Sequence, residues 1–223
     1  MGRIFLFPGF GEDAYCFDEL LPYLQKSHEL FPVDYRPVLD KFTFPLISRM
    51  QFCHAIIRYY GIKKQDKIIG HSMGGYLAFQ IREIIYNDIC LVGSFCDPQK
   101  IIQFFPQSPR LSQLVAGSGL IKTDFLRNYL LSKIQDERIK TVQEKVMRNM
   151  KSFSNTQLAL MLEVSYESKI ISEQVNPLRI HAKTDKVVLP PDESYIEVDG
   201  GHFCMNLYPE QVASAMKEND FIS

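Results

Sequence analysis

The chain has 223 residues, of which 46% are hydrophobic and 23% charged, and its net charge at pH 7 is -1. These values are typical of a globular domain and exclude a largely disordered chain. The near-neutral charge argues against a nucleic-acid-binding protein, because such proteins usually carry a basic excess or stripe. The length corresponds to one domain, or to one domain with an insertion.

The N-terminal apolar run Ile4–Phe7 is short and stops at a turn. A secretory signal needs a longer apolar core, and no segment approaches the roughly 18 apolar residues of a membrane span. The five cysteines contain no C-x-x-C pair, which predicts buried reduced thiols and a cytoplasmic location. Cys204 lies close to His202 and is either a nucleophile or, as its apolar surroundings favour, a small buried hydrophobe.

Short apolar runs alternate along the chain with longer segments of helical period. Strands are predicted at residues 3–7, 29–33, 67–69, 89–92, 178–182 and 195–198. Helices are predicted near residues 14–26, 45–60, 73–86 and 209–218. Several strands are apolar throughout, as strands buried on both faces are. The pattern predicts an α/β fold with three layers, in which about six mostly parallel strands have helices on both faces.

Residues 98–168 break this alternation, because they contain helical patterns and no convincing strand. Apolar residues recur at helical spacing around Phe125, Val146 and Leu158. We interpret this segment as a helical cap inserted between the two parts of the core, residues 1–97 and 169–223. At most positions these stripes are expected to be ordinary core rather than substrate contacts.

The segment Gly70-His71-Ser72-Met73-Gly74 follows one predicted strand and precedes a predicted helix. G-x-S-x-G in this context is typical of a nucleophile elbow, in which glycines allow a sharp turn and the serine hydroxyl is exposed. The alternative is a glycine-rich turn with an incidental serine. We predict that Ser72 is a nucleophile and that His71 packs beneath the elbow.

A serine hydroxyl needs a base within hydrogen-bonding reach, and the base needs a third group to orient it. His202 follows the last predicted strand in Gly200-Gly201-His202 and is the predicted base, a structural histidine being the alternative. Asp185 follows the fifth predicted strand and is the preferred acid. Asp97, after the fourth strand, is the alternative acid.

The first predicted strand ends in a loop bracketed by Gly9 and Gly11. Its backbone N–H groups could bind an oxyanion, and we predict that the donors are the N–H of Phe10 and that of Met73. A plain tight turn is the alternative. Glu12 and Asp13 follow at once, and they would disfavour anionic substrates if they faced the pocket.

Together, the loop around Phe10, the elbow at Ser72, the acid loop at Asp185 and the segment at His202 resemble the α/β-hydrolase family. The resemblance covers nearly the whole chain and implies serine-dependent acyl chemistry. Two departures stand out. The chain begins at the position of the family's third strand, and the stretch between Asp185 and His202 is short.

We therefore expect a cytoplasmic serine hydrolase that cleaves a carboxylic ester or thioester through an acyl-enzyme. The aromatic and methionine residues of the cap suggest a partly apolar acyl group. No cofactor or metal is expected, since the histidines lack ligand spacing. One alternative is a C–C bond hydrolase or lyase that uses the same triad on a small metabolite. Another is a non-catalytic receptor or scaffold on the same fold.

Overall fold

The computed structural model describes residues 2–24, 28–43, 48–102, 114–172 and 177–222. In these residues a six-stranded sheet runs in the order β2-β1-β3-β4-β5-β6. The strands are β1 (Gly2–Phe7), β2 (His28–Pro32), β3 (Lys67–His71), β4 (Asp88–Val92), β5 (Leu178–His181) and β6 (Ile196–Glu197). Every neighbouring pair is parallel, so the six predicted strands are present and form one parallel sheet.

Two separate apolar clusters bury the two faces of the sheet. Along β1, Ile4 and Leu6 belong to one cluster and Phe5 and Phe7 to the other. The alternation follows because successive side chains of a strand point to opposite faces. Each of these four side chains is at most 1% exposed. Burial on both faces explains why the strands are apolar throughout.

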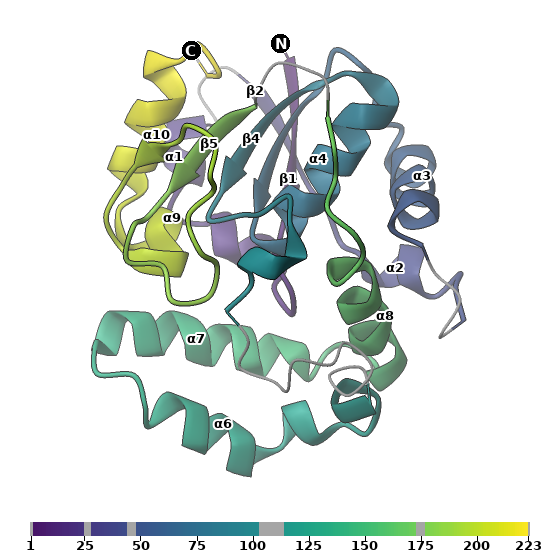
Figure 1. Ribbon diagram of the computed structural model, residues 1–223, viewed down its shortest axis with the longest axis vertical. Helices are drawn as coiled ribbons and strands as arrows, with labels where there is room; N and C mark the ends of the chain where they lie inside the picture. Colours follow the sequence, from purple (N-terminus) through teal and green to yellow (C-terminus); the bar gives the residue numbers. More distant parts are fainter. Residues whose placement is uncertain (1, 25–27, 44–47, 103–113, 173–176, 223) are drawn as a thin grey trace.

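Helices cover both faces and complete the three layers (Figure 1). On the Phe5 face lie α2 (Arg36–Leu39), α3 (Arg49–Tyr60), α4 (Met73–Ile85) and α8 (Asn155–Ser165). On the Ile4 face lie the 3-10 turn η1 (Ala14–Phe17), α1 (Leu21–Leu24), α9 (Cys204–Leu207) and α10 (Pro209–Glu218). The α/β class and the three-layer arrangement are confirmed.

The prediction of one helix over residues 14–26 is wrong. The chain forms the separate short elements η1 and α1 there, and residues 25–27 lie outside the described residues. Pro22 explains the break, because proline has no N–H to donate and its ring clashes with the carbonyl four residues earlier. It is tolerated in α1 because it lies in the first turn.

The helix predicted over residues 45–60 begins later, at Arg49, and residues 44–47 lie outside the described residues. Ser48 and Gln51 form a capping box, in which each side chain accepts the other residue's backbone N–H at 3.2 Å. This reciprocal pair satisfies two of the donors that a helix N-terminus leaves free. The capping residues therefore fix where α3 starts.

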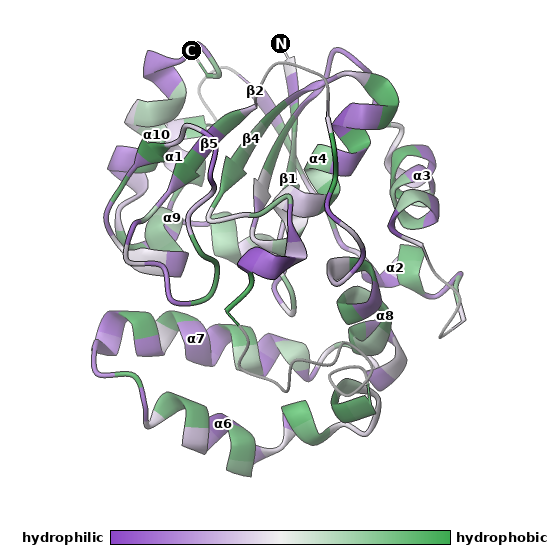
Figure 2. Cartoon of the chain, in the orientation of Figure 1, coloured by the Kyte–Doolittle hydropathy of each residue, from purple (hydrophilic) through white to green (hydrophobic). Residues whose placement is uncertain are grey.

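Two further helices, α6 (Asp124–Leu131) and α7 (Glu137–Met150), lie at the end of the sheet toward which the strands run (Figure 1). Polar and apolar residues alternate along α7, whereas the strands are mostly apolar (Figure 2). Val146 of α7 is buried, but Phe125 and Tyr129 of α6 are 83% and 53% exposed.

The third apolar stripe of the predicted cap has a different location. Leu158 and Met161 of α8 are completely buried in the cluster on the Phe5 face of the sheet. The helix thus contributes to the core, as was expected for most cap positions. The cap boundaries at residues 98 and 168 stay a prediction, and residues 103–113 of this segment lie outside the described residues. No described helix is long and apolar enough to cross a membrane.

Candidate active site

Ser72 lies at the turn between β3 and α4, with φ at +51° and ψ at -122°. A positive φ costs a residue with a side chain about 1–3 kcal/mol, so the surrounding structure must hold it. The Ser72 N–H donates to the Val92 carbonyl at 3.1 Å. The Ser72 carbonyl accepts the Ser94 hydroxyl at 2.6 Å and the Gly75 N–H at 3.0 Å. The next strand, β4, therefore holds the strained serine in place.

The glycines around Ser72 allow the close backbone approaches on which the elbow depends. A Cβ on Gly70 would lie 2.5 Å from the Cα of Gly75, where β3 meets α4. A Cβ on Gly74 would lie 2.5 Å from the Pro8 carbonyl oxygen, in the loop after β1. Both distances are shorter than a real Cβ contact, so only glycine fits. The strand-to-helix turn expected from the sequence is present.

His202 lies in the short 3-10 turn η4 (Gly201–Phe203), and its ring is hydrogen-bonded to Asp185. The His202 Nδ1 is 2.9 Å from the Asp185 Oδ2. The other oxygen, Oδ1, accepts the backbone N–H groups of Val187 at 2.7 Å and Val188 at 2.9 Å. Burial of Asp185 opposes its ionisation, but His202 and these two N–H groups outweigh it, so the pKa of the carboxyl is lowered.

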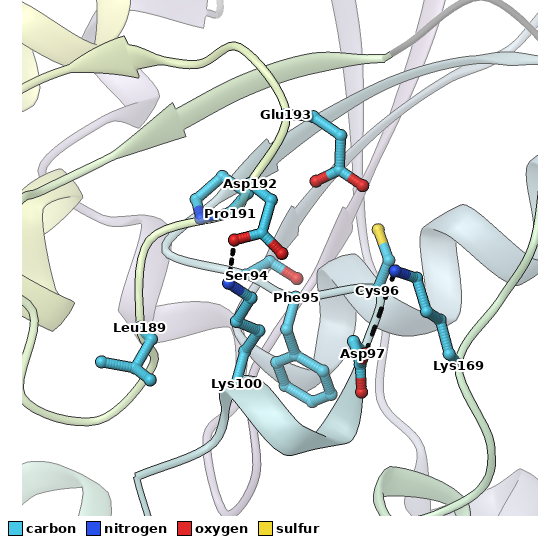
Figure 3. Close-up of a pocket in the computed structure, with 10 residues that line it drawn as sticks. All are labelled: Ser94, Phe95, Cys96, Asp97, Lys100, Lys169, Leu189, Pro191, Asp192 and Glu193. Atoms are coloured by element: carbon cyan, nitrogen blue, oxygen red, sulfur yellow. Dashed lines mark hydrogen bonds and ion pairs between the residues drawn. The ribbon is translucent and has the colours of Figure 1, made fainter.

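Asp97 has other partners. It caps the 3-10 turn η2 (Pro98–Lys100) by accepting the Gln99 N–H at 2.9 Å, and its second oxygen is 4.0 Å from the Lys169 Nζ. Figure 3 shows Asp97 and Lys169 on one side of a small pocket and the ion pair of Lys100 and Asp192 on another. Of the two acids considered from the sequence, Asp185 is the one that contacts His202.

The loop after β1 runs beside the elbow. A Cβ on Gly9 would lie 3.1 Å from the Cβ of Ser72. Phe10, whose N–H was predicted to bind an oxyanion, follows Gly9 directly. Met73, the other predicted donor, is the first residue of α4, so its N–H has no acceptor within the helix. Both predicted donors thus belong to segments that border Ser72.

Glu12 and Asp13, which follow this loop, both have hydrogen-bonding partners within the fold. Glu12 is 4% exposed, and its Oε2 accepts the Gly9 N–H at 2.7 Å and contacts the His71 Nδ1 at 2.8 Å. Asp13 accepts the Tyr15 N–H at 3.1 Å and caps η1. The Glu12 carboxylate is thus turned inward onto a histidine, a contact that we did not expect from residues 59 positions apart.

His71 is completely buried beneath the elbow, as predicted. A further histidine, His181, has its Nε2 3.6 Å from the Asp185 Oδ2 and bonded to the Val188 carbonyl at 3.1 Å. His181 is the last residue of β5 (Leu178–His181), four positions before Asp185, so the strand brings it to the same loop.

All five cysteines are free and buried. Burial, with a smaller contribution from Asp185, raises the pKa of the Cys204 thiol to about 12, so Cys204 is a buried hydrophobe and not a thiolate nucleophile. Among the described residues no group of three or more His, Cys, Asp or Glu side chains could hold a metal ion.

A parallel sheet with helices on both faces and a strained serine between a strand and a helix defines the α/β-hydrolase fold. The chain belongs to this family of enzymes, because the model of the alpha/beta hydrolase family matches residues 4–215. No curated protein sequence matches the chain.

Several solved structures share the fold at low sequence identity. A thermophilic esterase from Thermogutta terrifontis superposes with a TM-score of 0.74 at 16% identity, covering 99% of this chain and 90% of that one. An enol-lactonase from Burkholderia xenovorans gives 0.69 at 16% identity, with the same coverage. The RedJ thioesterase of Streptomyces coelicolor gives 0.61 at 15% identity, covering 96% and 90%.

Proposed function

We propose that the protein is a serine hydrolase that cleaves a carboxylic ester or thioester through an acyl-enzyme. The proposal rests on the hydrogen bond of 2.9 Å between the His202 Nδ1 and the Asp185 Oδ2. The segment that contains His202 is in turn hydrogen-bonded to the elbow. This bond is made by His71, the residue before Ser72. The His71 Nε2 is 2.9 Å from the His202 carbonyl oxygen. The rings of His71 and His202 have their centroids 4.8 Å apart.

In this proposal the Ser72 hydroxyl attacks the substrate carbonyl and passes its proton to His202. The proton goes to Nε2, because Asp185 holds the proton on Nδ1. The N–H groups of Phe10 and Met73 stabilise the oxyanion of the tetrahedral intermediate. His202 then protonates the departing alcohol or thiol. Water, deprotonated by His202, then attacks the acyl-serine, and His202 returns that proton to the Ser72 oxygen as the carboxylic acid leaves.

The contacts of α7 support a partly apolar acyl group. A Cβ on Gly11 would lie 2.5 Å from the Cγ of Met150, so the methionine side chain lies directly on the loop after β1. The Asn149 side-chain amide donates to the Gly11 carbonyl at 2.9 Å and fixes this approach. Phe10, in the same loop, is half-buried against the apolar cluster of the Phe5 face. Met150 and Phe10 thus place apolar side chains at the loop beside Ser72, and burial against such side chains stabilises a bound hydrocarbon.

The test is labelling with a fluorophosphonate probe, which reacts with activated serines. We expect the wild-type protein to be labelled and Ser72→Ala to remain unlabelled. An unlabelled wild-type protein contradicts the proposal and favours the receptor or scaffold. A panel of p-nitrophenyl esters and acyl-thioesters of increasing chain length then separates esterase from thioesterase. Labelling without turnover of either class favours C–C cleavage.

A further inference from the structure

A buried pair of ionisable side chains, Glu12 and His71, lies beneath the elbow and is not used in the proposed reaction. Glu12 is 4% exposed and His71 is completely buried. Their contact is 2.8 Å, from the Glu12 Oε2 to the His71 Nδ1. Burying two such groups is costly unless they are paired and hydrogen-bonded, so the fold must satisfy each of their polar atoms.

The hydrogen bonds define the protonation of the pair. The His71 Nε2 is 2.9 Å from the His202 carbonyl oxygen, which can only accept, so Nε2 carries a proton. The Glu12 Oε2 already accepts the Gly9 N–H at 2.7 Å. The second proton of the pair lies between Oε2 and Nδ1, and on Nδ1 it gives an ionised carboxylate oxygen two donors, which is the stronger, charge-assisted arrangement. His71 is then an imidazolium, with one proton for each of its two acceptors.

The directions of the pKa shifts agree with this assignment. Burial raises the pKa of Glu12, but the charge and hydrogen bond of His71 outweigh it, so the pKa is lowered. Burial lowers the pKa of His71, but Glu12 and the His202 carbonyl outweigh it, so the pKa is raised. The other titratable or charged groups around the pair are Asp13, Tyr15, Cys16, Tyr35, His181, Asp185 and His202.

The pair joins three segments that come from distant parts of the chain. Glu12 holds the Gly9 N–H in the loop after β1, His71 is part of the elbow, and His202 is held through its carbonyl. A Cβ on Gly93, at the end of β4, would lie 3.2 Å from that carbonyl oxygen and 3.6 Å from the His71 Nε2. The pair therefore lies at the point where the predicted oxyanion loop, nucleophile and base meet.

We infer that Glu12 and His71 are positioning residues for the reaction, and that as a carboxylate–imidazolium pair they set the oxyanion loop and the base loop relative to Ser72. This inference rests on the proposed function. Glu12 would disfavour anionic substrates if it faced the pocket, but it is turned inward onto His71. The charge of Glu12 instead keeps two protons on His71.

Glu12→Gln is the informative variant, because it is nearly isosteric, removes the charge and leaves one oxygen, the second carboxylate oxygen becoming an NH₂ group. An amide oxygen can still accept the Gly9 N–H. A neutral His71 then has one proton, which can serve the amide oxygen or the His202 carbonyl but not both. Asp13→Asn is the matched control, since it makes the same chemical change one residue away and keeps the cap of η1.

We expect Glu12→Gln to lower kcat for a p-nitrophenyl ester about 10- to 100-fold, because small displacements of catalytic groups cost about that much. KM should change less than about threefold, since substrate binding does not need the pair. Asp13→Asn should match the wild type. Equal kcat for Glu12→Gln and the wild type overturns the inference, and so does a change confined to KM. Circular dichroism checks that both variants are folded.

A second measurement needs no variant and no activity. In ¹⁵N NMR spectra of the wild-type protein, both ring nitrogens of His71 should carry protons at pH 7. A neutral His71 at that pH overturns the inference even if Glu12→Gln fails to fold. The two proposals are tested separately. A wild-type protein that does not react with fluorophosphonate refutes the hydrolase, whereas a reactive wild type with an unaffected Glu12→Gln variant refutes only the role of the pair.

Discussion

Asp185→Asn tests the proposed mechanism most directly, because the structure dictates how the new amide must lie. In the wild type, Oδ1 accepts the N–H groups of Val187 and Val188, at 2.7 Å and 2.9 Å. Oδ2 is 2.9 Å from the His202 Nδ1. An amide has one oxygen and one NH₂ group. The two backbone donors require the oxygen at the Oδ1 position, which leaves the NH₂ group facing His202.

An NH₂ group in that position donates to the His202 Nδ1, so the proton of a neutral His202 must move to Nε2. Nε2 then has no lone pair for the Ser72 proton, and the base is lost although the side chains hardly move. The equivalent change in a serine-protease triad lowers kcat about 10⁴-fold. At 1.36 kcal/mol for each factor of ten, we expect an activation barrier about 5 kcal/mol higher.

The assay compares kcat for a p-nitrophenyl ester and the rate of fluorophosphonate labelling in the wild type, Asp185→Asn and Asp97→Asn. Asp97→Asn is the matched control, because its amide oxygen can still accept the Gln99 N–H and only a weak ion pair 4.0 Å apart is lost. We expect its kcat to be unchanged. A kcat of Asp185→Asn within tenfold of the wild type contradicts Asp185 as the acid of the triad. An equal loss of kcat in Asp97→Asn contradicts it as well.

Three further predictions follow from the packing. Gly74→Ala should lower the free energy of unfolding by about 1–3 kcal/mol in urea denaturation, because its Cβ meets backbone rather than a mobile side chain. Gly117→Ala, on a helical backbone with open space around it, should leave the free energy of unfolding unchanged or raise it by up to about 1 kcal/mol. Met150→Ala should lower kcat/KM for long acyl esters about tenfold relative to acetate; an unchanged ratio would exclude Met150 from the acyl site. Glu12→Gln should lower the free energy of unfolding by about 3 kcal/mol between pH 4.5 and 6.5. These limits are the ordinary pKa values of a glutamate such as Glu12 and a histidine such as His71. That difference should shrink as the pH falls through the lowered pKa of Glu12 or rises through the raised pKa of His71, and a pH-independent difference in urea denaturation would contradict the ion pair.

The strands and the position of the elbow can be predicted from the sequence, because their residue patterns are local. Runs such as Ile4–Phe7 are apolar on both faces, which is typical of a buried parallel strand. The spacing of Gly70–Gly74 between a strand and a helix marks the turn, and the contacts of Gly70 with Gly75 are local, although Gly74 packs on the remote Pro8 carbonyl. The break within residues 14–26 is local as well, because Pro22 lacks the N–H that a continuous helix needs.

Which carboxylate contacts which histidine depends on the packing of segments that are remote in the chain. Asp97 and Asp185 both follow strands, and only the packing of the loops shows that Asp185 contacts His202. Glu12 and His71 are 59 residues apart, and no local pattern pairs them. The physical reason is that a hydrogen bond depends on positions within a few tenths of an ångström. Local periodicity defines elements, but the packing of those elements against one another sets distances between side chains that are remote in the chain.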